Sequence, residues 1–394
     1  MKIEDGGAGA SLARWLLSAY LLVLVAGFFV LRSPIAMVRG NELSFERAVF
    51  ATINAGTLTG FQQTIETDTY LWPGQMAVLV LTWAGALFSL VAGGTAVARI
   101  TRLPFTEGEV ARTALLLTFG ASVLGAVPLV FAGRSVLAAI FQATSAFGNG
   151  GLVMGRHEGA GGWPMHIVLL PLAVVGGLGV TVLMELWRRQ PLSRHARTVL
   201  AWSAGLYLFG VVLLLLLQTP WDAAGGWPEA LVLSSAASLD ARTLGMPIDL
   251  GTLSRAGQWM LMGLMVIGAA SGGTGGGLKV TIIPLMILGT RGALAGRTGG
   301  RVLGVALAWA GVYALVVIVS LLALLATEPQ MPGDRLLFVA VSAASNVGLS
   351  HDPISITGAG LHVLSVTMLL GRLAPVAVLW WMAKTTPEAD VAAG

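Results

Sequence analysis

The most regular feature of this chain is a series of long apolar stretches separated by polar, basic or glycine-rich segments. A helix needs about 20 apolar residues to cross the hydrocarbon core of a bilayer. The pattern predicts eight membrane-spanning helices, over residues 12–33, 70–98, 109–132, 164–187, 197–219, 255–290, 300–326 and 359–383. We expect the first to be a span and not a cleaved signal peptide, since it lacks an obvious small-residue cleavage site. The predicted fold class is therefore all-α integral membrane.

The composition agrees with this pattern and narrows the chemistry. Hydrophobic residues make up 56% of the chain and charged residues 11%, whereas a soluble domain carries about 25% charged residues. Cysteine is absent, which excludes metal sites with thiolate ligands. The five histidines show no metal-ligand spacing. No cluster of His, Asp and Glu, no Ser–Lys pair and no paired intramembrane aspartates indicate an enzyme. We therefore expect no enzymatic activity, no cofactor and no nucleic-acid partner.

The distribution of arginines predicts the orientation in the membrane. They gather in three connections between spans, at residues 99–112, 188–197 and 291–301. Short basic connections lie on the cytoplasmic side of a membrane. Because the number of predicted spans is even, both termini are then cytoplasmic, and the chain is expected to be a multi-pass protein of the cell membrane.

The connections on the other side share one pattern. Each contains an apolar stretch of about a dozen residues, too short to span, followed by a segment with glycine. The short stretches cover residues 44–56, 135–147, 228–241 and 334–344. Ser44 and Asp334 are expected to cap the first and the fourth. The order span, short helix, glycine segment, span occurs four times, which predicts four tandem units at residues 1–98, 99–190, 191–292 and 293–394.

Short helices of this kind predict re-entrant pore loops. Non-helical backbone at membrane depth is tolerated only where it is buried in protein or lines a water-filled cavity. Four such loops around one axis form a central pore, in which backbone carbonyls replace the hydration shell of a cation. Each short helix would direct the negative end of its dipole at that pore. The alternative is four packed hairpins outside the membrane; the recurrence of a glycine segment in every unit favours re-entrant loops.

The glycine segments carry a family resemblance. They are Thr57-Leu58-Thr59-Gly60, Asn149-Gly150-Gly151, Thr243-Leu244-Gly245 and Asn346-Val347-Gly348. In this order and place they resemble the filter loops of the Trk/Ktr/HKT superfamily of potassium transporters, and the eight-span length is closest to the Ktr pore subunit. The resemblance covers residues 12–383 and implies that one glycine per unit lines the filter and binds K⁺ through its carbonyl. The matching positions are Gly60, Gly151, Gly245 and Gly348.

A glycine-rich segment at residues 268–279 interrupts the sixth predicted span. It contains Gly272, Gly273, Thr274, Gly275, Gly276, Gly277 and Lys279. This much glycine should break a helix. The segment resembles the family's intramembrane gating loop, and Arg372 in the last span matches the arginine that the family places beside that loop as a barrier to cations. The alternatives are a helix-packing surface of small residues and an arginine that snorkels to the interface.

The predicted function is potassium uptake through a filter that the segment 268–279 gates. The alternative is a Na⁺- or H⁺-coupled carrier with broken helices. Such carriers have inverted repeats and often hold acidic residues at mid-membrane, whereas the units here are parallel and this chain has almost no such residues. The resemblance further implies a homodimer in the lipid bilayer and a cytosolic nucleotide-binding regulatory ring on the basic inner connections.

Overall fold

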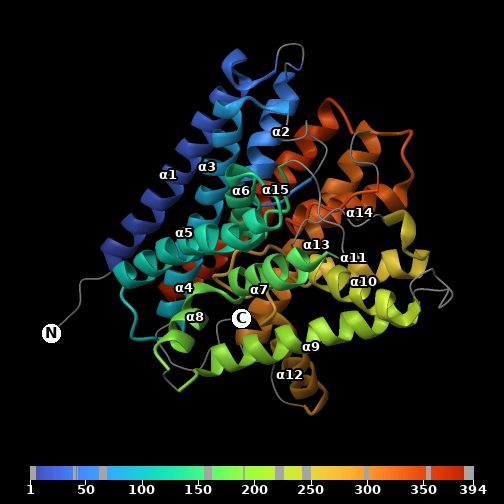
Figure 1. Cartoon of the computed structure of the whole chain (residues 1–394). Coiled ribbons are helices and arrows are strands. Elements are labelled where there is room, and N and C mark those ends of the chain that lie inside the picture. Colours follow the sequence, from blue (N-terminus) through green and yellow to red (C-terminus); the bar gives the residue numbers. More distant parts are fainter. Residues whose placement is uncertain are drawn as a thin grey trace.

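The computed structural model describes most of the chain. The described residues are 6–38, 41, 43–61, 69–154, 162–189, 191–217, 226–241, 250–296, 301–351 and 356–385. Within them every regular element is a helix, apart from two isolated bridges between single residues (Figure 1). The all-helical class that the apolar pattern predicts is therefore confirmed for the described part of the chain.

Six helices of the described residues are long and apolar enough to cross a membrane. They are α1 (Gly6–Arg32), the continuous helix formed by α3 (Trp72–Phe88), η3 (Ser89–Gly93) and α4 (Gly94–Ile100), α5 (Glu107–Phe131), α9 (Arg194–Leu217), α13 (Arg301–Thr327) and α15 (Ala359–Thr385). Their outer faces expose large apolar side chains such as Leu22, Leu116, Leu216 and Leu322, each at least 60% exposed. Continuous apolar surface of this extent is typical of contact with lipid.

The other two predicted spans are broken. The fourth consists of η4 (Met165–Leu169) with α7 (Leu170–Leu178), followed after a bend of 100° by α8 (Val180–Trp187). Gly179 makes the bend with a φ of 88°, a conformation that favours glycine. The sixth consists of α11 (Arg255–Val266) and α12 (Ile282–Leu294), separated by non-helical backbone. A continuous helix over residues 164–187 was therefore the wrong expectation, whereas the break in the sixth span lies where the glycine-rich segment at residues 268–279 predicts it.

Four short helices occur close to the predicted positions. They are α2 (Phe45–Gly56), α6 (Val136–Gly148), α10 (Gly226–Asp240) and α14 (Gly333–Ala344). Ser44 caps α2 as expected, because its side chain accepts a hydrogen bond from the Arg47 amide. The expected cap at Asp334 is wrong: Pro332 holds the N-cap position, and Asp334 lies in the first turn of α14, where its charge still favours the helix dipole.

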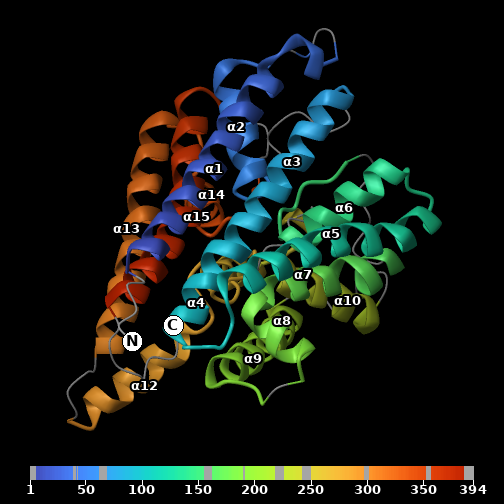
Figure 2. The same cartoon turned by 90° about the vertical axis from the view of Figure 1, so that its left-hand side faces the viewer.

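The last helices of the chain close the arrangement against the first. α15 packs on α2 and α4, and α14 packs on α11, α13 and α15. Figure 2 shows α13 on the left of α1 and α3 on its right. At one end of this group, Leu379 and Trp380 of α15 form an apolar cluster with Ala96 and Val97 of α4 and with Ala13 of α1. This packing surrounds the ends of the short helices with the long ones.

A candidate ion filter and gate

Three of the four predicted filter segments lie within the described residues, and they share one backbone conformation. Each has a positive φ at a residue just past its short helix and again at the glycine two positions later. The pairs are Leu58 (58°) with Gly60 (85°), Asn149 (53°) with Gly151 (61°), and Asn346 (50°) with Gly348 (87°). Positive φ is uncommon for residues other than glycine, so its recurrence in three different sequences indicates one repeated structure. The remaining predicted positions, residues 243–245, lie outside the described residues.

These three segments meet through their backbones. A Cβ atom added at Gly60 would lie within 3.0 Å of the Gly150 carbonyl oxygen. One added at Gly348 would lie equally close to the Thr59 carbonyl oxygen. Real Cβ atoms essentially never come so close to another atom. Only glycine at positions 60 and 348 therefore lets the backbone of the first segment contact the backbones of the second and the fourth segments.

A second set of glycines lies where the short helices end, and sequence reasoning missed it. Each is on the long helix that follows its filter segment, and an added Cβ would collide with a carbonyl oxygen of a short-helix end. The pairs are Gly85 with Gly56, Gly176 with Phe147, and Gly371 with Ala344. The recurrence of a glycine at nearly the same separation from each filter glycine is the sequence feature that identifies them. These contacts fix the end of each short helix against its own long helix.

Buried amide and hydroxyl side chains tie the first and fourth segments together. The Asn54 side chain donates to the Phe61 carbonyl (2.7 Å) and accepts from the Phe61 amide (2.9 Å). Asn346 Nδ2 donates to Thr59 Oγ1 (3.0 Å) and to the Met368 carbonyl (2.9 Å). All of these groups are buried. The side chains thus hold the segments from behind, and Asn54 is a residue that sequence reasoning did not single out.

The segment at residues 268–279, which we call the glycine loop, lies against the second and fourth filter segments. Thr274 Oγ1 donates to the Phe147 carbonyl (3.0 Å) and accepts from Asn149 Nδ2 (2.7 Å). An added Cβ at Gly276 would collide with the Ser345 carbonyl oxygen, at the end of α14. The loop therefore contacts the ends of two short helices at once.

The broken and irregular long helices make room for this loop. Val180, the first residue of α8, donates its amide hydrogen to the Gly272 carbonyl (3.3 Å). On the other side, an added Cβ at Gly93 would lie 2.8 Å from Gly272 Cα, where the π-helical turn η3 joins α4. The loop is closed at its base, since the Gly268 amide donates to the Leu278 carbonyl (2.7 Å). It is thus a compact insertion that contacts both the broken fourth span and the helix formed by α3, η3 and α4.

Arg372 connects the glycine loop to the first filter segment. Its side chain is 3% exposed. Nε donates to the Thr57 carbonyl (2.8 Å), as does Nη2, while Nη1 donates to the Thr274 carbonyl (2.5 Å) and to Ser89 Oγ (3.3 Å). Arg372 therefore points into the protein, and the alternative of an arginine that snorkels to the interface is wrong.

Lys279 is the second buried cation of this region. It is 7% exposed, and Nζ donates to the Gly275 carbonyl (2.8 Å). Among the residues that the structure describes, neither Lys279 nor Arg372 forms an ion pair with a carboxylate. One positive charge without a carboxylate partner thus lies at the end of the loop and another beside it, and both contribute to the wall of a cavity together with Ser89 and Gly272.

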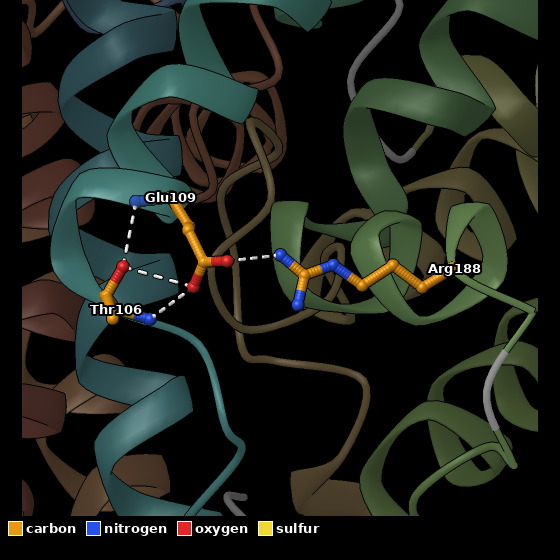
Figure 3. Close-up of polar contacts among 3 residues, drawn as sticks. All are labelled: Thr106, Glu109 and Arg188. Atoms are coloured by element: carbon orange, nitrogen blue, oxygen red, sulfur yellow. Dashed lines mark hydrogen bonds and ion pairs between the residues drawn. The ribbon is translucent and has the colours of Figure 1, made fainter.

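An ion pair joins the end of α8 to the start of α5. Glu109 Oε2 accepts from the Thr106 amide (2.8 Å), which forms a capping box at the start of α5. Its other oxygen accepts from Arg188 Nη2 (2.5 Å) at the end of α8 (Figure 3). α8 therefore contacts the glycine loop at one end, through Val180, and the start of α5 at the other.

Known proteins resemble this chain over nearly its whole length. No family model matches it. It is 25% identical to the Ktr system potassium uptake protein B of Vibrio alginolyticus, over 95% of this chain and 92% of that protein. It is also 25% identical to the potassium/sodium uptake protein NtpJ of Enterococcus hirae, over 92% of this chain and 91% of that protein.

The fold has a solved counterpart, and the relatives are named as transport proteins, not as enzymes. The crystal structure of the potassium transporter TrkH from Vibrio parahaemolyticus matches with a TM-score of 0.74 and 19% identity, covering 94% of this chain and 85% of that one. The match in fold, the full-length relatives and the four glycine segments are consistent with one another. The chain is similar to the Trk/Ktr potassium transporters in sequence over nearly its whole length, and it shares the fold of TrkH.

Proposed function

We propose that the chain is a pore subunit for potassium uptake across the cell membrane. In this proposal K⁺ binds to backbone carbonyls of the four filter segments, 57–60, 149–151, 243–245 and 346–348, with one glycine of each segment in the ring. The observation that carries the proposal is the repeated backbone of three segments that meet at Gly60. A ring of carbonyls is the arrangement that replaces the hydration shell of K⁺.

The short helices add electrostatic support. α2, α6 and α14 all end directly at a filter segment, so that their negative dipole ends lie beside it. A helix C-terminus carries roughly half a negative charge, which attracts a cation and repels an anion. The segments themselves contain no acidic residue, and in this proposal carbonyls and dipoles provide the selectivity.

The glycine loop is the proposed gate, with residues 272–277 as its mobile part and with Lys279 and Arg372 as an electrostatic barrier. Three observations support this. The loop contacts two filter segments, its glycines permit backbone rearrangement, and two buried positive charges lie beside it. In a medium of low dielectric constant, such charges repel a permeating cation strongly. Displacement of the loop would open the path and separate Thr274 from Arg372.

The remaining architecture is proposed on the same basis. We place four tandem units at residues 1–98, 99–190, 191–292 and 293–394, each with two membrane passes, counting the broken helices as passes. The recurrence of the short helices supports this division, and the basic connections support cytoplasmic termini. A homodimer and a cytosolic nucleotide-binding regulatory ring are proposed by family resemblance. No observation on this chain favours a coupled carrier.

Rubidium and potassium uptake into proteoliposomes that hold the purified chain tests this function, with Na⁺ and Li⁺ as competitors. We expect K⁺-selective uptake, and we expect Gly60→Ser to lower the preference for K⁺ over Na⁺, because any side chain at Gly60 displaces the Gly150 carbonyl. Gly108→Ser is the matched control, since nothing lies within 4 Å of its added Cβ. An unchanged ion preference in folded Gly60→Ser protein would contradict the proposed filter. Uptake that strictly requires a Na⁺ or H⁺ gradient would favour the carrier.

A further inference from the structure

An apolar cavity lies beside the glycine loop, between α12, α13 and α15. The cavity is partly open to the surroundings of these helices. Ile282 and Leu285 line it from α12, Ala306 and Trp309 from α13, and Leu379 from α15. Ligand-binding sites typically have mostly apolar walls with a few polar groups. The wall of this cavity has that composition.

Lys279 is the one charged residue in the wall of this cavity. An ammonium group has three hydrogen-bond donors, and the described contacts of Lys279 use one of them, to the Gly275 carbonyl. A buried charge without a counter-ion is costly, and within a membrane protein such a residue generally has a partner or a function. An anionic group at this position would supply the missing counter-charge.

Lys279 also stands between two compartments. A smaller cavity is lined by Ser89, Gly272 and Arg372, and it shares Lys279, Pro375 and Leu379 with the apolar cavity. A ligand that pairs with Lys279 from the apolar side would therefore contact the end of the glycine loop. The geometry connects a hydrophobic binding site directly to the residues that we propose as a gate.

We propose that this cavity binds an amphiphilic anion, with its apolar chain between α12, α13 and α15 and its anionic head against Lys279. A water-soluble anion would gain nothing from the apolar walls, and a neutral hydrocarbon would leave the lysine unpaired. A membrane contains amphiphilic anions in two forms, free fatty acids and anionic phospholipids, with the same head-and-chain chemistry. Binding would hold the glycine loop in its seated position and so slow the flux of cations. The effect on flux rests on the proposed function, whereas the binding itself does not.

Quenching of Trp309 fluorescence by a brominated acyl chain tests the site on the purified full-length chain in a neutral detergent. Trp309 is 8% exposed and lines the cavity. We expect 9,10-dibromostearate to quench part of the fluorescence in a saturable way, and Trp309→Phe to abolish that part. Lys279→Gln should weaken binding about tenfold or more, as the loss of a charged hydrogen bond predicts. The matching brominated alcohol should not saturate the site.

Two further variants separate binding from a folding defect. Ala306→Phe fills the cavity and leaves Lys279 in place, so it should abolish the saturable quenching. Ala314→Phe on the exposed side of the same helix is its matched control. A second titration with brominated phosphatidylglycerol identifies which natural form binds more tightly. Equal quenching in the wild type, Lys279→Gln and Ala306→Phe, or equal quenching by acid and alcohol, overturns the proposal.

Rubidium uptake by the same preparations distinguishes this proposal from the proposed function. Saturable binding at Lys279 without any cation uptake would support the site and count against the pore. Selective uptake without saturable quenching would support the pore and overturn the site. Where both hold, we expect the fatty acid to slow uptake by the wild type and to have little effect on the Ala306→Phe variant.

Discussion

Replacement of Thr274 by valine tests whether the seated glycine loop blocks the proposed pore. Valine has nearly the shape of threonine but lacks the hydroxyl group. The substitution removes the donor to the Phe147 carbonyl and the acceptor for Asn149 Nδ2. The backbone bond from the Thr274 amide to the Gly176 carbonyl remains. The change therefore acts on the contact between the loop and the second filter segment.

The magnitude follows from these two hydrogen bonds. A neutral hydrogen bond contributes about 0.5–1.5 kcal/mol net to stability. Loss of both bonds should therefore destabilise the seated position of the loop by about 1–3 kcal/mol. Asn149 Nδ2 keeps its bond to the Ala173 carbonyl (3.1 Å), which places the expected loss in the lower half of that range. Since 1.4 kcal/mol is a factor of ten, the equilibrium between seated and displaced loop should shift about 5- to 30-fold toward displacement.

The assay is the initial rate of rubidium uptake into proteoliposomes at matched protein content. We expect Thr274→Val to increase the rate several-fold, and Thr274→Ser, which keeps the hydroxyl group, to stay near the wild-type rate. A thermal melt of each preparation establishes that the variants are folded. Equal rates for folded Thr274→Val and Thr274→Ser would refute the reasoning, and so would a Thr274→Val rate below that of the wild type.

Three other substitutions test neighbouring parts of the site. Gly371→Ala should lower the melting temperature, because its Cβ would collide with the Ala344 carbonyl and overpacking typically costs about 1–3 kcal/mol; Gly263→Ala, with open space around its Cβ, should have a much smaller effect, and equal melting temperatures would contradict the contact. Arg372→Met should raise rubidium uptake and lower the preference for K⁺ over Na⁺, since it removes both the charge and the bond to the loop; an unchanged uptake rate in folded protein would count against a barrier. Arg188→Gln should leave the melting temperature nearly unchanged at physiological salt, because half-exposed ion pairs are screened; a large decrease would show that the pair to Glu109 contributes more than its exposure suggests.

Most helices of this protein follow from local properties of the sequence. Length and apolarity place the long helices, since a lipid-facing helix must be apolar over about 20 residues whatever lies beside it. The start of α2 was equally predictable, because the Ser44 cap depends only on residues three positions apart. The positive φ of Gly60 and Gly348 also agrees with the reason for expecting glycine there.

The tertiary structure alone decided where the fourth span breaks and which groups meet. Gly179 lies within an apolar stretch that predicts a continuous helix. In the structure this helix bends by 100° at Gly179. At the bend, the Val180 amide donates a hydrogen bond to the glycine loop, which lies almost a hundred residues further along the chain. Arg372 likewise finds its partners at Thr57 and Thr274. Sequence patterns report on neighbours along a helix, whereas these contacts exist only after separate parts of the chain pack together, because a buried carbonyl or guanidinium must then satisfy its hydrogen bonds within the protein.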